Sequence, residues 1–177
     1  MKLSPSSGAR WRRTAVPDEI RLLIASDEDM LPARAQGREL ALQLGFSRTD
    51  ATLIATAISE IARNIVVHVG SGEITMTPVE EDARYGLVIV ASDAGRGIDD
   101  VDAALEHGYA SRGGLGLGLP GARRLMDDFD VRSERGEGTT VTMTKWRVRD
   151  ELELLRERRR KQPAGQKAHQ PEGADRG

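Results

Sequence analysis

The sequence has no cysteine and few aromatic residues, which make up 3% of its 177 positions. Without cysteine, the protein has no disulfide bond, no thiolate metal site and no cysteine nucleophile. Its 3 histidines are too few and too scattered to indicate a zinc centre. The 26 basic and 28 acidic residues leave a net charge of −2, and with so few aromatic rings this balance argues against nucleic-acid binding.

Long hydrophobic runs are also missing. The longest apolar stretches, such as residues 86–91, are far too short to cross a bilayer. The first residues are polar and lack the apolar segment of a secretory signal. Hydrophobic residues (38%) suffice for one core, and charged residues (31%) for the surface around it. These features predict a soluble cytoplasmic protein with one folded domain and no membrane attachment.

Glycine, by contrast, is abundant, and nine of the 19 glycines fall into three clusters. The clusters are Gly95 with Gly97, then Gly113 to Gly121, then Gly136 with Gly138. Each cluster lies close to a strongly apolar segment. Glycines grouped in this way indicate a backbone that approaches a ligand closely.

Apolar periodicity predicts strands over 19–26, 73–79, 86–92, 129–134 and 139–147, and helices over 31–44, 50–68 and 119–128. We expect Pro32 in the first turn of the first helix and Thr49 or Asp50 as the N-cap of the second. The run 86–92 is expected to be a buried central strand. The order β-α-α-β-β-loop-α-β-β predicts an α+β fold, with helices on one face of a mixed sheet.

Composition divides the chain into three segments. Residues 1–18 are rich in Ser, Pro, Gly and Arg and are expected to form a flexible arm. Residues 19–147 carry the periodic elements and form the predicted folded domain. Residues 148–177 begin with a charged, helix-like stretch and end in a Gln-, Pro- and Gly-rich tail that we expect to be disordered.

Glu60 and Asn64 are the first candidates for chemistry. They are four residues apart in the predicted helix 50–68, so one lies a turn above the other, at the flank of the stripe formed by its isoleucines. A carboxylate and an amide there suit a base beside an oxygen ligand for Mg²⁺. The alternative that the spacing also allows is a surface glutamate, with the asparagine making a hydrogen bond on the flank of the helix.

Three further segments have the same ambiguity. Asp93 follows the most apolar strand and precedes Gly95 and Gly97, which suits recognition of an amine beside a flat ring but also an ordinary turn. The glycines of 113–118 precede a helix and leave N–H groups for an anion, or else form a lid without a ligand. Thr139 opens the last strand, where its hydroxyl either supports a base through water or belongs to a plain hairpin.

Together and in this order, these segments resemble the nucleotide-binding motifs of the GHKL ATPase and kinase superfamily. The similarity is strongest over residues 58–65 and 108–127, with Lys145-Trp146 near its end. These stretches look like the small serine-protein kinases of the bacterial stressosome, which are related to the anti-sigma-factor kinases. The resemblance covers roughly residues 19–147 and implies a two-layer α/β sandwich of the Bergerat type.

The resemblance also implies roles for individual residues. Glu60 is the catalytic base, Asn64 holds Mg²⁺, and Asp93 binds the adenine amino group. Arg112 is the one nearby cation we nominate for the γ-phosphate or a partner, although a solvated loop arginine is the alternative. The implied ATP-binding residues are Asn64, Asp93, Gly95, Gly97, Arg112, Gly113, Gly114, Leu115, Gly116, Leu117, Gly118 and Thr139.

The family implies an ATP-dependent serine/threonine-protein kinase whose substrate is a hydroxyl on a STAS-domain antagonist or scaffold protein. A PP2C-type phosphatase is a second partner of such kinases. Two other functions stay open at this point: an anti-sigma-factor kinase that sequesters a sigma factor, and a non-catalytic adaptor that activates a phosphatase. The presence of both Glu60 and Asn64 argues against the adaptor, because a docking protein needs neither.

Overall fold

The protein is described here by a computed structural model, which places residues 17–81, 84–107 and 118–148. These residues form four helices and five strands. The helices are α1 (Asp27–Gln43), α2 (Arg48–His68), α3 (Val101–His107) and α4 (Gly118–Leu125). The strands are β1 (Ile20–Ile24), β2 (Gly72–Glu81), β3 (Arg84–Asp93), β4 (Asp128–Glu134) and β5 (Gly138–Val148). None of the helices in the described ranges is long and apolar enough to cross a membrane.

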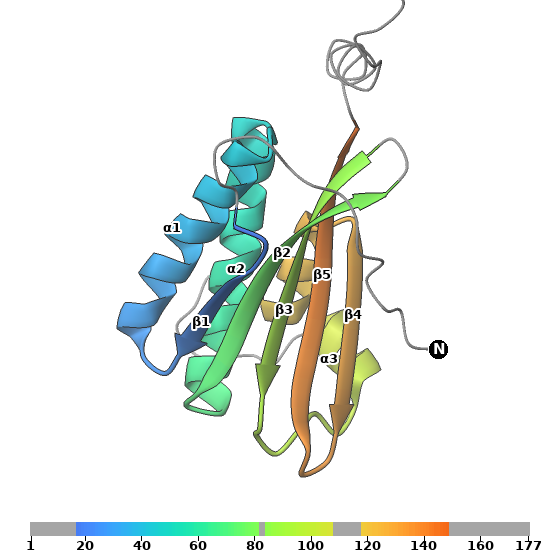
Figure 1. Ribbon diagram of the computed structural model, residues 1–177. Helices are drawn as coiled ribbons and strands as arrows, with labels where there is room; N and C mark the ends of the chain where they lie inside the picture. Colours follow the sequence, from blue (N-terminus) through green and yellow to red (C-terminus); the bar gives the residue numbers. More distant parts are fainter. Residues whose placement is uncertain (1–16, 82–83, 108–117, 149–177) are drawn as a thin grey trace, which may run out of the picture.

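The five strands form one sheet in the order β1-β2-β3-β5-β4, and the helices lie on one side of it (Figure 1). This arrangement confirms the predicted α+β sandwich. One detail of the prediction is wrong, because all four strand pairings are antiparallel and the sheet is not mixed. β4 does run in the same direction as β3, but β5 lies between them and pairs with both.

The core lies between helix α2 and the covered face of the sheet. Along β3, Leu87, Ile89 and Ala91 are buried while Val88 and Val90 on the opposite face are half-buried. β3 is therefore central, as predicted, but only one of its faces packs against helices. The largest fully buried side chains are Ile24, Leu40, Ile54, Ile58, Ile61, Ile74, Met76, Leu87, Ile89 and Met143.

Both long helices begin earlier than the sequence patterns predicted. The Asp29 carboxylate accepts hydrogen bonds from the N–H groups of Ala25 and Ser26, each at 2.9 Å, and these bonds lower the pKa of Asp29. Helix α1 therefore starts at Asp27, and Pro32 lies inside it instead of in its first turn. The N-cap of α2 is Ser47, whose Oγ accepts a bond from the N–H of Asp50 at 3.0 Å.

Helix α3 was missed, since its acidic sequence showed no apolar period. Asp100 precedes it and accepts a hydrogen bond from the N–H of Ala103 at 2.9 Å through its side chain. Ala104 is the buried contact of this short helix with the rest of the core. The segment is thus a helix stabilised mainly at its N-terminus.

The turn between β4 and β5 contains two glycines with positive φ, Gly136 (85°) and Gly138 (92°). They differ in their surroundings. A Cβ added at Gly136 meets nothing within 4 Å, whereas one at Gly138 falls 2.0 Å from the carbonyl oxygen of Asp93. Gly138 therefore serves two purposes: it turns the chain, and it lets β5 begin in direct contact with the end of β3.

We expect Gly138→Ala to destabilise the protein more than Gly136→Ala. Both changes place a side chain in the left-handed region, at about 1–2 kcal/mol each. Gly138→Ala adds a backbone clash with Asp93, for which forced repacking typically costs about 1–3 kcal/mol more. Urea unfolding of the two variants measures the difference. Equal losses of unfolding free energy would show that the contact with Asp93 relaxes freely.

Candidate functional site

A cavity of about 230 Å³ lies at the end of the sheet where β3 finishes and β5 begins, bounded by the last turns of α2 and the start of α4. The described residues that line it are Ile61, Asn64, Ile65, Val67, His68, Val69, Ala91, Asp93, Arg96, Gly97, Ile98, Gly118, Leu119, Thr139 and Val141. Asn64, Asp93, Gly97, Gly118 and Thr139 are therefore brought together, as the sequence analysis expected. They come from five separate parts of the fold: α2, β3, the loop after β3, α4 and β5.

Asp93 ends β3 at the base of this cavity. Its Oδ1 accepts hydrogen bonds from the N–H of Gly95 at 2.9 Å and from the N–H of Thr139 at 3.3 Å. Its Oδ2 makes no hydrogen bond to another described residue. One oxygen thus fixes the carboxylate to two backbone segments, and the other remains an acceptor for a ligand.

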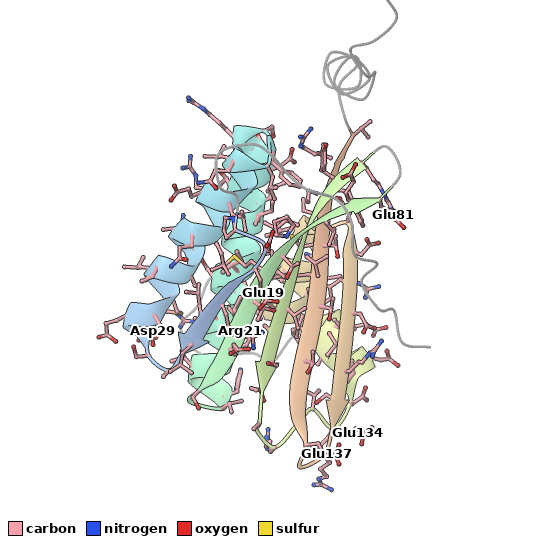
Figure 2. The ribbon with its side chains drawn as sticks, viewed as in Figure 1. Glu19, Arg21, Asp29, Glu81, Glu134 and Glu137 are labelled. Carbon is pink, nitrogen blue, oxygen red and sulfur yellow. The ribbon has the colours of Figure 1, made fainter. Side chains whose placement is uncertain are left out.

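The loop after Asp93 is held against the β4–β5 turn. The N–H of Gly136 donates to the carbonyl oxygen of Arg96 at 2.8 Å. Gly97 has φ of 77°, and a Cβ there would lie 2.2 Å from the carbonyl oxygen of Glu134. Figure 2 shows Glu134 at this end of the sheet. Gly97 is therefore needed for backbone packing, apart from any contact with a ring.

Gly95 has a different place from the one expected. It is not among the described cavity-lining residues, and its N–H donates a hydrogen bond to Asp93 Oδ1. A Cβ at Gly95 would lie 2.6 Å from a methyl group of Val69. Its small size thus lets the loop pack on the end of α2, and a contact of Gly95 with ATP stays a prediction.

Glu60 lies half-buried on α2, and its Oε2 accepts a hydrogen bond from the N–H of Gly118 at 2.9 Å. Gly118 is the first residue of α4 and lines the cavity. The carboxylate therefore lies beside the cavity's edge, at the positive end of a helix dipole, where a negative charge is favourable. The alternative that the spacing left open placed Glu60 at the surface, whereas the residue is half-buried and hydrogen-bonded to Gly118.

Asn64, one turn after Glu60, does line the cavity. Its amide oxygen is a suitable hard ligand for Mg²⁺. No group of three or more His, Cys, Asp or Glu side chains within the described ranges could hold a metal ion without further ligands. Asn64 would thus contribute one of the oxygen ligands that Mg²⁺ prefers, to an ion that arrives with the phosphates of a nucleotide.

The apolar walls of the cavity were not predicted as part of the site. Ile61 and Ile65 are one turn apart on α2, and Val141 faces them from β5. In the sequence, these two isoleucines belong to the apolar stripe of the predicted helix 50–68. A hydrophobic residue on a helix facing a sheet has the same pattern whether it meets another side chain or a flat ligand, so the sequence carries no signal that separates the two.

Ser133 was also missed. It lies on β4 opposite Thr139, and its Oγ is 3.0 Å from the Thr139 hydroxyl and 2.9 Å from the carbonyl oxygen of Gly138. The N–H of Ile98 donates to the same Ser133 Oγ at 2.8 Å. A serine in a polar, alternating edge strand gives no indication in the sequence that it links three segments of the site.

Several predicted residues lie outside the described ranges: Arg112, Gly113, Gly114, Leu115, Gly116 and Leu117. The structure does place Gly118, the last residue of that predicted phosphate loop. Of the three predicted segments, the arm 1–18 and the extension 148–177 are placed only at their inner ends.

Comparisons with known proteins support the family resemblance that the sequence motifs predicted. The histidine kinase-like ATPase domain profile matches residues 23–145. The serine/threonine-protein kinase RsbT of Bacillus subtilis is 44% identical over 129 residues, covering 73% of this chain and 97% of RsbT. An anti-sigma F factor of Clostridium acetobutylicum is 31% identical, covering 72% of this chain and 91% of that protein. These relatives confirm the predicted resemblance to the small serine-protein kinases and the assignment of the chain as an enzyme of that class.

A solved structure supports the fold. The RsbU and RsbW domains of a Mycobacterium tuberculosis protein match 73% of this chain with a TM-score of 0.50 and 22% identity. The match spans 33% of that longer chain, so the likeness concerns the fold of one part of it. Because the ATPase profile covers most of this sequence and RsbT aligns over nearly its whole length, the chain belongs to the histidine kinase-like ATPase domain family.

Proposed function

We propose that this protein is a cytoplasmic, ATP-dependent serine/threonine-protein kinase that phosphorylates a STAS-domain antagonist protein in a bacterial stress-response partner-switching (stressosome) pathway. The observation that carries the proposal is the hydrogen bond of Glu60 to Gly118 beside a cavity that contains Asn64 and Asp93. The residues proposed as base, metal ligand and amine acceptor thus lie at one end of the sheet. The 44% identity to RsbT supports the same reaction class.

The residues around the cavity suit adenine and its phosphates. Ile61, Ile65 and Val141 offer apolar surface to a flat ring, and Asp93 Oδ2 accepts a hydrogen bond from its amino group. Helix α4 begins at Gly118, and the N-terminus of a helix favours phosphate. The N–H of Gly118 itself is bonded to Glu60. Bound Mg²⁺, held by Asn64, would supply neutralisation of phosphate charge.

Phosphoryl transfer to a serine or threonine requires mostly positioning and one proton acceptor. The substrate oxygen forms a bond to the γ-phosphorus, ADP leaves, and the hydroxyl proton passes to the Glu60 carboxylate. The bond to Gly118 occupies one oxygen of Glu60, so the other is available for that proton. The dipole of α4 holds the carboxylate in place before the substrate arrives.

An anti-sigma-factor kinase is the second candidate, favoured by the 31% identity to an anti-sigma F factor. Such a protein would also sequester a sigma factor. The higher identity to RsbT favours the first candidate. Co-purification with sigma factors from the same source separates the two, since only the second candidate retains one.

A phosphatase of the PP2C type is the other partner we propose, activated by the kinase after it leaves its antagonist. A purely non-catalytic adaptor is disfavoured, because Glu60 and Asn64 are both present, Asn64 in the cavity lining and Glu60 bonded to Gly118 at its edge. The direct test of the proposal is transfer of radiolabelled phosphate from ATP to purified STAS-domain proteins of the same source. Binding of ATP without any transfer would support the adaptor instead.

We expect Asp93→Asn to weaken ATP binding by about 1–3 kcal/mol, the usual cost of an unpaired buried hydrogen-bonding group. The asparagine oxygen can still accept from Gly95 and Thr139, but its NH₂ group replaces the acceptor that faces the cavity. Calorimetry with ATP measures the loss. Asp99→Asn is a matched control, because Asp99 is exposed and pairs with Arg135 outside the cavity lining. Equal affinities of Asp93→Asn and the parent would remove Asp93 from the site.

Glu60→Gln should leave ATP binding nearly intact while slowing phosphoryl transfer by ~10²–10⁴-fold. The glutamine oxygen can still accept the N–H of Gly118, so the start of α4 keeps its partner. What is lost is the ability to take a proton at neutral pH. The measurement pairs calorimetry with single-turnover transfer, and transfer at the parental rate would show that Glu60 is not the base.

Asn64→Ala should differ from Glu60→Gln: we expect weaker ATP binding as well as slower phosphoryl transfer. It removes a Mg²⁺ ligand that acts before the reaction begins, whereas Glu60 acts in the transition state. Titrating ATP with and without Mg²⁺ measures the effect. If Asn64→Ala binds ATP with the parental dependence on Mg²⁺, the metal is held by other groups.

A further inference from the structure

Ser133 Oγ is the meeting point of three hydrogen bonds behind the cavity. It accepts the N–H of Ile98 at 2.8 Å, and it lies 2.9 Å from the carbonyl oxygen of Gly138 and 3.0 Å from Thr139 Oγ1. These partners belong to the loop after β3 and to the start of β5. Of the three, Ile98 and Thr139 also line the cavity.

The chemistry of the partners decides which way each proton points. A hydroxyl has one proton to donate and two lone pairs to accept with. The amide of Ile98 can only donate, and the carbonyl of Gly138 can only accept. Ser133 therefore gives its proton to Gly138, and the bond between the two hydroxyls then requires Thr139 to donate to Ser133. All three contacts are hydrogen bonds only in this arrangement.

The reverse arrangement leaves one contact unmade. If Ser133 gave its proton to Thr139, the carbonyl of Gly138, a buried residue, would lose this partner. A buried acceptor without a partner is costly. The side chain of Ser133 is half-buried and fixed by the Ile98 amide, so its Oγ stays within reach of both other groups.

We propose that Ser133 is a positioning residue that orients the Thr139 hydroxyl and thereby makes the polar end of the cavity selective for a base with an amino group. The inference rests on the proposed ATP binding. With its proton committed to Ser133, Thr139 offers only lone pairs to the cavity, and Asp93 Oδ2 is likewise an acceptor. A purine whose six-position carries a carbonyl oxygen meets two acceptors and is rejected. An amino group at that position, as in adenine, can donate.

The test compares ATP with ITP, which differ at that edge of the base. Dissociation constants for both, with Mg²⁺, come from competition against a fluorescent ATP analogue. In Ser133→Ala the Thr139 hydroxyl is free to turn and donate into the cavity. We expect the ITP-to-ATP ratio of dissociation constants to fall by about three- to tenfold, the effect of one neutral hydrogen bond.

A purely structural role for Ser133 predicts a different result. Loss of the Ile98 contact alone would weaken ATP and ITP by the same factor and leave the ratio unchanged, which would overturn the proposal. Ser133→Thr is the conservative control, since it keeps the hydroxyl and suits a strand. It should restore the parental ratio. Failure to restore it, in a variant that unfolds at the parental urea concentration, would also count against the proposal.

Thr139→Val is an independent test of the proposal, and it can be used if Ser133→Ala does not fold. Valine removes the acceptor without changing the side-chain shape greatly, so ATP should bind more weakly while ITP does not. Equal weakening of both nucleotides would contradict an acceptor at that position. Measurements on the parent protein separate this proposal from the proposed function. If the parent binds no ATP, the proposed function is wrong. If the parent binds ATP but the ITP-to-ATP ratio of dissociation constants is unchanged in the variants, only the role of Ser133 is refuted.

Discussion

The loop after β3 and the β4–β5 hairpin meet backbone to backbone, and the candidate site depends on that contact. Gly138 approaches the carbonyl of Asp93, and Gly97 approaches the carbonyl of Glu134, each too closely for any Cβ. Because neither contact involves a flexible side chain, it leaves little freedom to the segments it joins. The carboxylate of Asp93 and the hydroxyl of Thr139 are therefore placed by the sheet itself, before any ligand binds.

Helix α2 connects the site to the stability of the whole domain. Its isoleucines fill the core, while Glu60 and Asn64 project from the flank of the same stripe toward α4 and the cavity. A rotation of the helix that moved these polar groups would also expose buried isoleucine. The apolar packing thus fixes the direction in which Glu60 and Asn64 project, because a rotation of these polar groups requires a loss of buried apolar surface.

Much of this arrangement was predictable, and the failures have specific causes. The helical spacing of the isoleucines located α2, and glycines near strand ends located the loops of the site. The start of α1 was missed although Ser26 and Asp29 carry a cap signal three residues apart, because the apolar pattern was followed instead. The antiparallel sheet was missed because the insertion of β5 between β3 and β4 is a long-range choice. The role of Ser133 could be seen only in the structure, since Ser133 joins Ile98, which is 35 residues away in sequence, to Gly138 and Thr139 across the β4–β5 hairpin.

The two ends of the site differ in how they are built, and this difference fits the two tasks of a kinase. At the end proposed to bind the nucleobase, hydrogen bonds join Asp93, Thr139 and Ser133 within one sheet and its turns. These bonds favour a fixed pattern of acceptors. At the other end, a single bond joins Glu60 to the first residue of α4. In the proposed function, the dipole of α4 would attract both Glu60 and an incoming phosphate and so offset the repulsion between them. Recognition of the nucleobase would then depend on a rigid network, whereas stabilisation of the phosphate charge would depend on one shared helix end.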